Sequence, residues 1–216
     1  MKSRYSKNSL IVLISLIFFE AYFLKTAMGA EINAKPSSIN PEIVDVVLSG
    51  KILKNDCHKF KAIFQENDAI RYLVLEKSGG GNATEAQCIS SFVHKNKIAT
   101  AVDKFCFSAC SRIWASGRLR MLLSNKSMVG FHGNYLNKKR HDVGTKLLKL
   151  WLETMMPSAS KTQMHEWLAL RHSELMVYTN HTRSLCSLRK VPYERPKRTC
   201  KRLSGSALTA GLLKMK

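Results

Sequence analysis

The sequence predicts an α/β fold built on a mostly parallel sheet. Short apolar runs alternate with amphipathic stretches, so strands are expected at 70–75, 98–102 and 128–132, and helices at 84–95 and 108–116. Elements that alternate at these lengths form right-handed crossovers between parallel strands. A glycine triplet at 79–81 and the pair Ser108-Ala109 each follow an expected strand. Ligands of parallel sheets bind beyond the carboxyl ends of the strands, which predicts one site for both features.

The chain of 216 residues divides into four expected parts. Residues 1–30 are expected to be a signal peptide, 31–42 a polar linker, 43–182 one α/β domain, and 183–216 a basic, cysteine-containing tail. The length and the hydrophobic share of 45% suit one well-filled domain with some appended sequence.

The first 30 residues have the layout of a secretory signal peptide. A basic start precedes an apolar run over 10–19, and small residues allow cleavage after Gly29 or Ala30. An uncleaved membrane anchor is the alternative, because apolar residues at 22–24 prolong the run. In both cases the rest of the chain is expected outside the cytoplasm, in the periplasm or secreted.

The expected domain contains further elements on either side of its central strands. A strand is expected at 43–48, a helix at 56–66 and helical structure from 144 to 178, interrupted at Pro157. Asn82 is expected to cap the 84–95 helix, and Glu85 to complete a loose capping box. The apolar stripe of the late helical segment predicts packing against the core or against a partner, including a second copy of the chain.

Six cysteines follow the expected signal peptide, an even number that suits disulfide bonds in an exported chain. Local pairing predicts one bond between Cys106 and Cys110 and another between Cys186 and Cys200. Free thiols buried in the core are the alternative. The spacing is unlike that of zinc ligands, so neither a metal nor another cofactor is expected.

The net charge of +20 indicates association with anionic surfaces. The basic segment 183–216 is the expected contact with an anionic envelope surface, and a simply solvated run of charges is the alternative. Nucleic-acid binding would rest on charge alone and is the least favoured function.

Four motifs in order resemble those of the Clp protease proteolytic subunit family, in the crotonase-like fold. They are the turn at 77–81, Phe107-Ser108-Ala109, Trp114-Ala115-Ser116-Gly117, and the strand that ends in His132. The likeness covers residues 43–135 and is greatest to the secreted, periplasmic Clp-like branch, which often has Cys-x-Ser-Ala-Cys. It implies a repeated β-β-α spiral with a mostly parallel sheet, followed by C-terminal helices that cover the site and meet neighbouring subunits.

The resemblance assigns roles at the predicted site. Ser108 would be a nucleophile and His132 its general base, while the backbone N–H groups of Ala109 and of Gly80 or Gly81 would form an oxyanion hole. Without the resemblance, Ser108 is simply a helix cap. The motifs together predict an exported serine hydrolase that cleaves a peptide or acyl bond.

The third member of a triad is absent where the family places an acid, near 178–182. Asn180 is the candidate there for orienting His132, and Asp142 or Glu174 could approach from elsewhere. Loss of the carboxylate typically costs several powers of ten in rate. The alternative hypothesis is therefore a catalytically inactive envelope protein that keeps the fold as a scaffold or binding surface.

Overall fold

The computed structural model describes residues 29–36, 43–67, 70–189 and 197–214. The helices of this part are α2 (Asp56–Gln65), α3 (Ala83–Lys95), α4 (Ala109–Ala115), α5 (Asp142–Met155) and α6 (Lys161–Ala169). The strands are β1 (Glu31–Pro36), β2 (Val44–Ser49), β3 (Ile70–Ser78), β4 (Ala99–Phe107), β5 (Arg120–Leu122), β6 (Met128–Phe131), β7 (Tyr135–Leu136), β8 (Lys139–Arg140), β9 (Glu174–Tyr178), β10 (Arg183–Arg189) and β11 (Lys197–Leu203).

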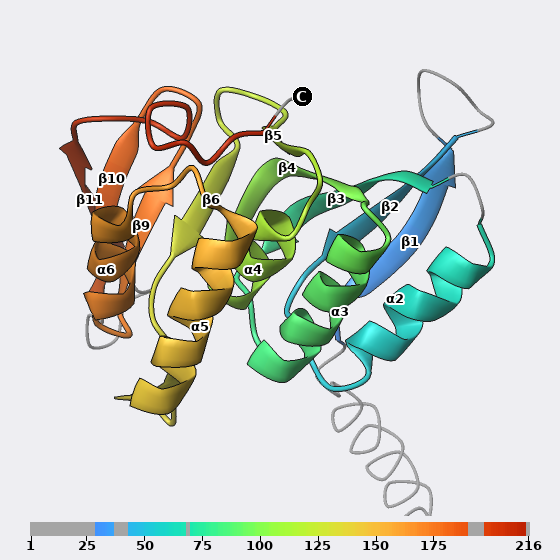
Figure 1. Cartoon of the computed structure of the whole chain (residues 1–216), viewed down its shortest axis with the longest axis horizontal. Coiled ribbons are helices and arrows are strands. Elements are labelled where there is room, and N and C mark those ends of the chain that lie inside the picture. Colours follow the sequence, from blue (N-terminus) through green and yellow to red (C-terminus); the bar gives the residue numbers. More distant parts are fainter. Residues whose placement is uncertain (1–28, 37–42, 68–69, 190–196, 215–216) are drawn as a thin grey trace, which may run out of the picture.

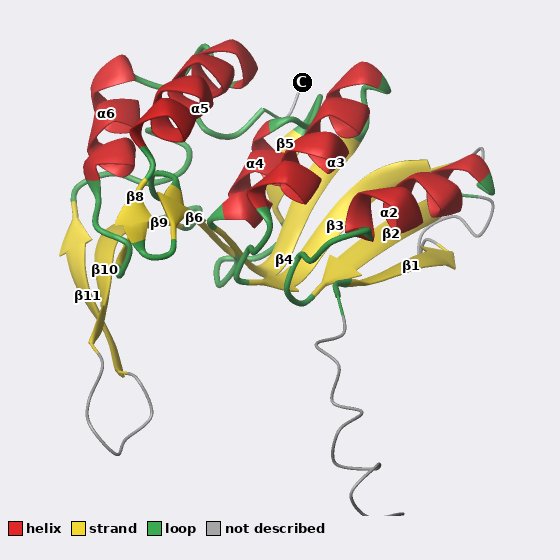
Figure 2. Ribbon diagram, turned by 90° about the horizontal axis from the view of Figure 1, so that it is seen from below, coloured by secondary structure: helices red, strands yellow, loops and turns green. Residues whose placement is uncertain are grey.

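One mixed sheet carries the fold, in the order β1-β2-β3-β4-β6-β9-β10-β11, with β5 beside β4. Strands β2, β3, β4 and β6 run parallel, while β1 and the three last strands pair antiparallel to their neighbours. Figures 1 and 2 show the described helices on one face of this sheet. The α/β class is confirmed, and the parallel part is the centre of the sheet. The repeated β-β-α spiral stays a prediction.

Both ends of the described chain extend the sheet. The segment expected to be a linker contains β1, where Ile32 is buried and pairs with the fully buried Leu48. The segment expected to be a basic tail contains β10 and β11, which pair with each other and join the sheet through β9. The sequence did not predict these strands because they carry many charged side chains. An antiparallel strand can carry such side chains on the face that is in contact with water.

The expected helix at 84–95 is α3, and Asn82 caps it by accepting hydrogen bonds from the N–H groups of Thr84 and Glu85. Glu85 does not complete a capping box. Its carboxylate accepts a hydrogen bond from the Cys57 N–H at 3.0 Å, which joins α2 to α3.

The helical stripe expected over 144–178 is wrong at its end. Residues Glu174–Tyr178 form β9, which pairs with β6 on one side and β10 on the other. A short apolar run does not distinguish a buried helix turn from a buried strand, and here pairing on both sides decides.

The described cysteines are all paired, in three disulfide bonds. Cys106–Cys110 and Cys186–Cys200 are the two predicted pairs, and Cys57–Cys88 joins α2 to α3. In the part of the chain that the structure describes, no helix is long and apolar enough to cross a membrane.

An aromatic cluster joins the end of β6 to α6 and β9. The Phe131 ring stacks on Trp167 with centroids 4.4 Å apart, and the Trp167 indole N–H donates to the Tyr178 hydroxyl at 2.8 Å. Phe131, Trp167 and Tyr178 are all buried. This packing fixes the strand end from which His132 emerges.

Candidate active site

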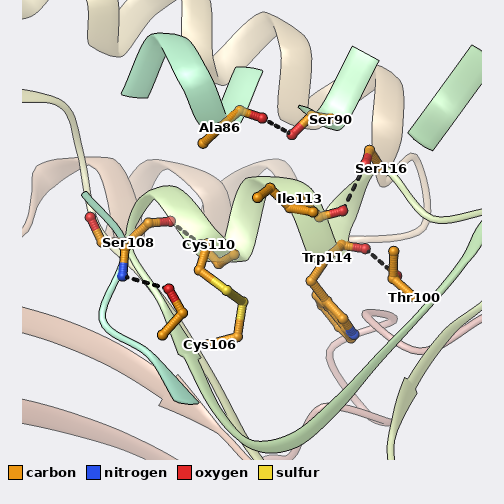
Figure 3. The surroundings of a disulfide bond; sticks show 12 residues. Ala86, Ser90, Thr100, Cys106, Ser108, Cys110, Ile113, Trp114 and Ser116 are labelled. Atoms are coloured by element: carbon orange, nitrogen blue, oxygen red, sulfur yellow. Dashed lines mark hydrogen bonds between the residues drawn. A yellow bond between two sulfur atoms is a disulfide. The ribbon is translucent and has the colours of Figure 1, made fainter. Parts of the chain in front are cut away.

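Ser108 occupies the sharp turn between β4 and α4. Its backbone has φ 58° and ψ −122°, a region that residues with a side chain rarely adopt and that is strained. The turn is held by a hydrogen bond from the Ser108 N–H to the Gly130 carbonyl at 3.0 Å and by the Cys106–Cys110 disulfide behind it. In Figure 3 the Ser108 side chain points away from the disulfide. Such a strained strand-to-helix turn exposes a serine hydroxyl at the end of the sheet.

The glycine turn packs directly against Ser108. At Gly80, which has φ +89°, a Cβ atom would lie 2.7 Å from the Phe107 carbonyl oxygen and 2.8 Å from the Ala109 nitrogen. Only glycine can hold this close approach and this backbone angle together. The turn after β3 and the turn after β4 therefore form one unit.

Two backbone N–H groups of the turns after β3 and β4 have no described partner. Neither the Gly81 nor the Ala109 N–H has a hydrogen-bond partner among the described residues, whereas the Gly80 N–H donates to the Ser78 hydroxyl at 3.2 Å. Of the two predicted alternatives, Gly81 is thus the one with a free donor. Its position is held by Ile52, which donates to the Gly80 carbonyl and accepts from the Asn82 N–H.

His132 follows β6 and is mostly buried. Burial lowers the pKa of its imidazole to about 4; the Gly133 carbonyl opposes this shift, and the nearby His172 and Arg112 add to it. The Nδ1 atom lies 2.6 Å from the Gly133 carbonyl oxygen. Because a carbonyl only accepts, Nδ1 carries the proton and Nε2 is left as the basic atom.

One cavity of about 1250 Å³ collects the predicted residues. Its lining includes Ser108, Ala109, Gly80, Gly81 and His132. No hydrogen bond joins Ser108 to His132 among the described contacts. Apo sites often have such loose geometry and tighten with substrate bound.

Asn180 does not line this cavity. Its side-chain amide donates to the carbonyls of Leu122 and Ser124 at 3.2 and 3.4 Å. The reason is the strand direction: β9 runs antiparallel to β6, with Tyr178 opposite Val129. Asn180 therefore lies beyond the start of β6, whereas His132 follows its end. The prediction that Asn180 orients His132 is therefore wrong.

Neither alternative acid supports His132. Asp142 forms an ion pair with Arg140 at 3.0 Å and its side chain is 85% exposed. Glu174 lines the cavity, but its carboxylate accepts from the Arg171 N–H at 2.9 Å. In the described part of the chain, no carboxylate is hydrogen-bonded to His132.

Three cavity residues were missed at the level of sequence. The Tyr135 ring lies between His132 and His172, with centroid distances of 5.4 and 5.3 Å. Arg112 is buried four residues after Ser108. The helical spacing from Ser108 was a signal for Arg112, since residues four apart share a helix face. No sequence signal marked His172.

The described part of the chain contains no group of three or more His, Cys, Asp or Glu residues that could hold a metal ion. The oligomer through the C-terminal helices and the contact with an anionic envelope surface stay predictions.

No family model and no curated protein matches this chain. Among solved structures, it is similar to a point mutant of the 1510-N membrane-bound stomatin-specific protease, at 15% identity and a TM-score of 0.45. That match covers 57% of this chain and 67% of the other. It is also similar to a point mutant of ClpP1 from Listeria monocytogenes, at 13% identity and a TM-score of 0.46, over 56% of this chain and 77% of the other.

Proposed function

We propose that this chain is a serine hydrolase of the Clp-like type that cleaves a peptide or acyl bond. The observation that carries the proposal is the strained turn at Ser108, with the glycine turn packed against it and His132 in the same cavity. A helix cap needs no positive φ and no glycine approach. The order of the motifs in the sequence supports the Clp-like fold.

In this mechanism the Ser108 hydroxyl attacks a carbonyl carbon while Nε2 of His132 takes its proton. The N–H groups of Gly81 and Ala109 stabilise the oxyanion that forms. The imidazolium then gives its proton to the leaving group. Water, activated by the same histidine, hydrolyses the acyl-enzyme and restores Ser108.

The Gly133 carbonyl takes the position of the missing carboxylate at Nδ1. It holds the tautomer but brings no negative charge to stabilise the imidazolium. Loss of a triad carboxylate costs roughly 10⁴-fold in rate, so we expect slow turnover.

A second candidate is a non-catalytic protein that keeps the fold as a scaffold. The observation that favours it is that the buried His132 is hydrogen-bonded only to the Gly133 carbonyl and to no described carboxylate. It predicts that Ser108→Ala leaves the cellular role of the protein intact.

The test is labelling of the full-length protein by a small fluorophosphonate. We expect a covalent adduct on Ser108, lost in Ser108→Ala and retained in Ser173→Ala, a control at another serine that lines the cavity. No adduct, or an adduct that persists in Ser108→Ala, would remove the hydrolase and leave the scaffold.

We also propose that the protein works outside the cytoplasm. Three disulfides suit an oxidising compartment, and the expected signal peptide supplies the route. Residues 1–28 of that signal lie outside the described residues.

A further inference from the structure

Arg112 is a buried cation that the proposed mechanism does not use. Its side chain lies on α4, is 9% exposed and lines the cavity beside Ser108 and His132. One guanidinium N–H donates to the side-chain oxygen of Asn134. Among the described residues, no carboxylate lies within ion-pair distance of Arg112. A buried charge without a counter-ion is costly, which calls for a partner from outside the chain.

Arg120, the other strongly buried arginine, shows what a structural role looks like. Its guanidinium donates to the carbonyls of Leu212 at 2.9 Å, Met155 at 3.1 Å and Ala115 at 3.5 Å, and so ties three segments together. The Arg112 guanidinium has one hydrogen-bond partner, Asn134. No nitrogen of Arg112 is both fully buried and without a partner. Its remaining N–H groups are therefore open to the cavity.

Arg112 is also held in place. The Asn134 backbone N–H donates to the Thr145 hydroxyl at 3.1 Å and its backbone carbonyl accepts from the His141 N–H at 2.9 Å, so the residue whose side chain binds the guanidinium is anchored. Burial lowers the pKa of Arg112 to about 10, which leaves the group charged at neutral pH. A fixed, charged guanidinium is suited to bidentate binding of a carboxylate.

The rest of the cavity has the same sign of charge. Further cations line it: Lys51, Lys77, Lys138, Arg171 and Arg198. The one acid of the lining is Glu174, whose carboxylate is engaged by a backbone N–H. A concave site lined by one sign of charge concentrates ligands of the opposite sign.

We propose that Arg112 binds a substrate carboxylate close to the bond that Ser108 attacks, so that the cavity selects acidic peptides. This inference rests on the proposed function. A peptide fits better than an acyl lipid, because Phe107 and Leu175 are the main large apolar side chains in the lining, too few to enclose a long acyl chain. Arg112 would determine specificity, while Ser108 and His132 carry the chemistry.

The test compares two diphenyl phosphonate probes that differ only in a glutamate or a glutamine side chain next to phosphorus. Ser108 attacks phosphorus and one phenol leaves. We expect the glutamate probe to label the full-length protein about tenfold faster or more, the size of a charge-assisted hydrogen bond. Arg112→Gln should remove this preference, so that the two probes label Ser108 at similar rates. Arg118→Gln, at an exposed arginine just after α4 and outside the cavity lining, is the matched control and should keep the preference.

A second measurement separates this inference from the proposed function and does not need Arg112→Gln to fold. Calorimetry of Ser108→Ala should show tighter binding of an acetylated peptide with glutamate than of its glutamine counterpart. Tighter binding without any labelling would overturn the hydrolase and keep the anion site. Labelling without preference would keep the hydrolase and overturn the anion site, and so would a preference that persists in Arg112→Gln. If phosphatidylglycerol vesicles slow labelling by the glutamate probe and the acidic peptide does not, the site would be reassigned to lipid and the peptide proposal overturned.

A different observation, independent of the hydrolase, concerns Ala30. This residue directly precedes β1, is 4% exposed, and donates its backbone N–H to the Asp56 carboxylate at 2.8 Å. Asp56 is fully buried and also accepts from the Leu53 N–H at 2.7 Å and from Lys59 at 3.0 Å. At Gly29, a Cβ atom would lie 2.4 Å from Asp56 Oδ1. The chain thus passes against a buried carboxylate at the predicted cleavage position.

We infer that the Gly29–Ala30 bond is the processing site and that Asp56 receives the new amino terminus. Hydrolysis consumes one water, leaves Gly29 as a carboxylate on the leader, and gives Ala30 an α-ammonium group. The pairing of Glu31 with Ser49 holds Ala30 in place afterwards. The ammonium would replace a neutral donor by a charged one and so add an ion pair to the hydrogen bond at the same carboxylate.

The test uses the full chain exported from a bacterial host. N-terminal sequencing should begin at Ala30, and an amine-acylating reagent should modify the Ala30 α-amine at least about tenfold more slowly in the native than in the urea-unfolded protein. The rate against pH should give an amine pKa above the ordinary value of about 8, since a carboxylate partner favours the charged form. Asp56→Asn should reverse that rise. A different first residue, equal rates, or a lowered amine pKa in the wild-type protein would overturn the inference without any variant.

Discussion

The two walls of the cavity, one around Ser108 and one around His132, differ in how firmly their contacts fix the site. On the Ser108 side, the glycine turn and the Ser108 turn follow two adjacent parallel strands, and a disulfide closes the second turn. On the histidine side, His132 is followed by short strands and a helix pair, and its Nδ1 meets only a neighbouring carbonyl. On the first side the N–H groups of Gly81 and Ala109 have no partner among the described residues, while on the second no described carboxylate is hydrogen-bonded to His132.

The difference follows from how each wall is specified. Backbone constraints fix the nucleophile side, because a Cβ at Gly80 would meet backbone atoms that cannot move independently. The histidine side depends on which side chain the antiparallel β9 brings near His132, and the β6–β9 register puts Met176 opposite Phe131. The proposed oxyanion donors can therefore stay fixed by the backbone while the partner of His132 changes.

The largest effect is expected from Gly80→Ala, which tests the rigid wall. The added methyl group would clash with the Phe107 carbonyl and the Ala109 nitrogen at a positive φ. We expect labelling of Ser108 to fall at least a hundredfold, and stability to fall by about 1–3 kcal/mol. Gly79→Ala is the matched control, because nothing lies within 4 Å of its added Cβ. Equal behaviour of the two variants in labelling and urea unfolding would contradict the close packing of the turns.

The pH dependence of the histidine side is the next largest effect. His132 has a folded pKa of about 4, below the ordinary value of 6.5, so protonation favours the unfolded chain between these values. The stability associated with neutral His132 is complete above pH 6.5 and is lost as the pH falls toward 4, by roughly 3 kcal/mol in total. The acid limb of kcat/KM should lie near pH 4.

Urea unfolding from pH 7 to 4 and a pH–rate profile check this prediction. His132→Gln should lose that part of the pH dependence of stability, while His94→Gln, at an exposed position on α3, should keep it. An acid limb between pH 6 and 7 would mean that a negative charge supports His132 after all.

The same contrast explains what sequence could predict. The turns that carry Ser108, Gly80 and Gly81 could be placed from sequence, because glycines and a strand-ending serine mark backbone requirements. Strands β10 and β11 were not, because their lysines and arginines resemble a solvated tail and their pairing is set by β9. The failure at Asn180 has the same cause, since sequence distance from His132 gives no information on strand direction. The helical spacing from Ser108 could have predicted that Arg112 lies near the site. Its burial without a carboxylate partner is visible only in the structure.

The smallest effect is expected from Asn180→Ala, which tests whether the histidine side has a remote orienter. Its amide binds the Leu122 and Ser124 carbonyls at a partly exposed position, so its loss should cost about 1 kcal/mol of stability. Labelling of Ser108 should stay within about threefold of wild type, because Asn180 lies at the opposite end of β6 from His132. Urea unfolding and probe kinetics measure the two quantities separately. A hundredfold loss of labelling at near-normal stability would restore Asn180 to the site, and would require β9 to pair with β6 in a different register.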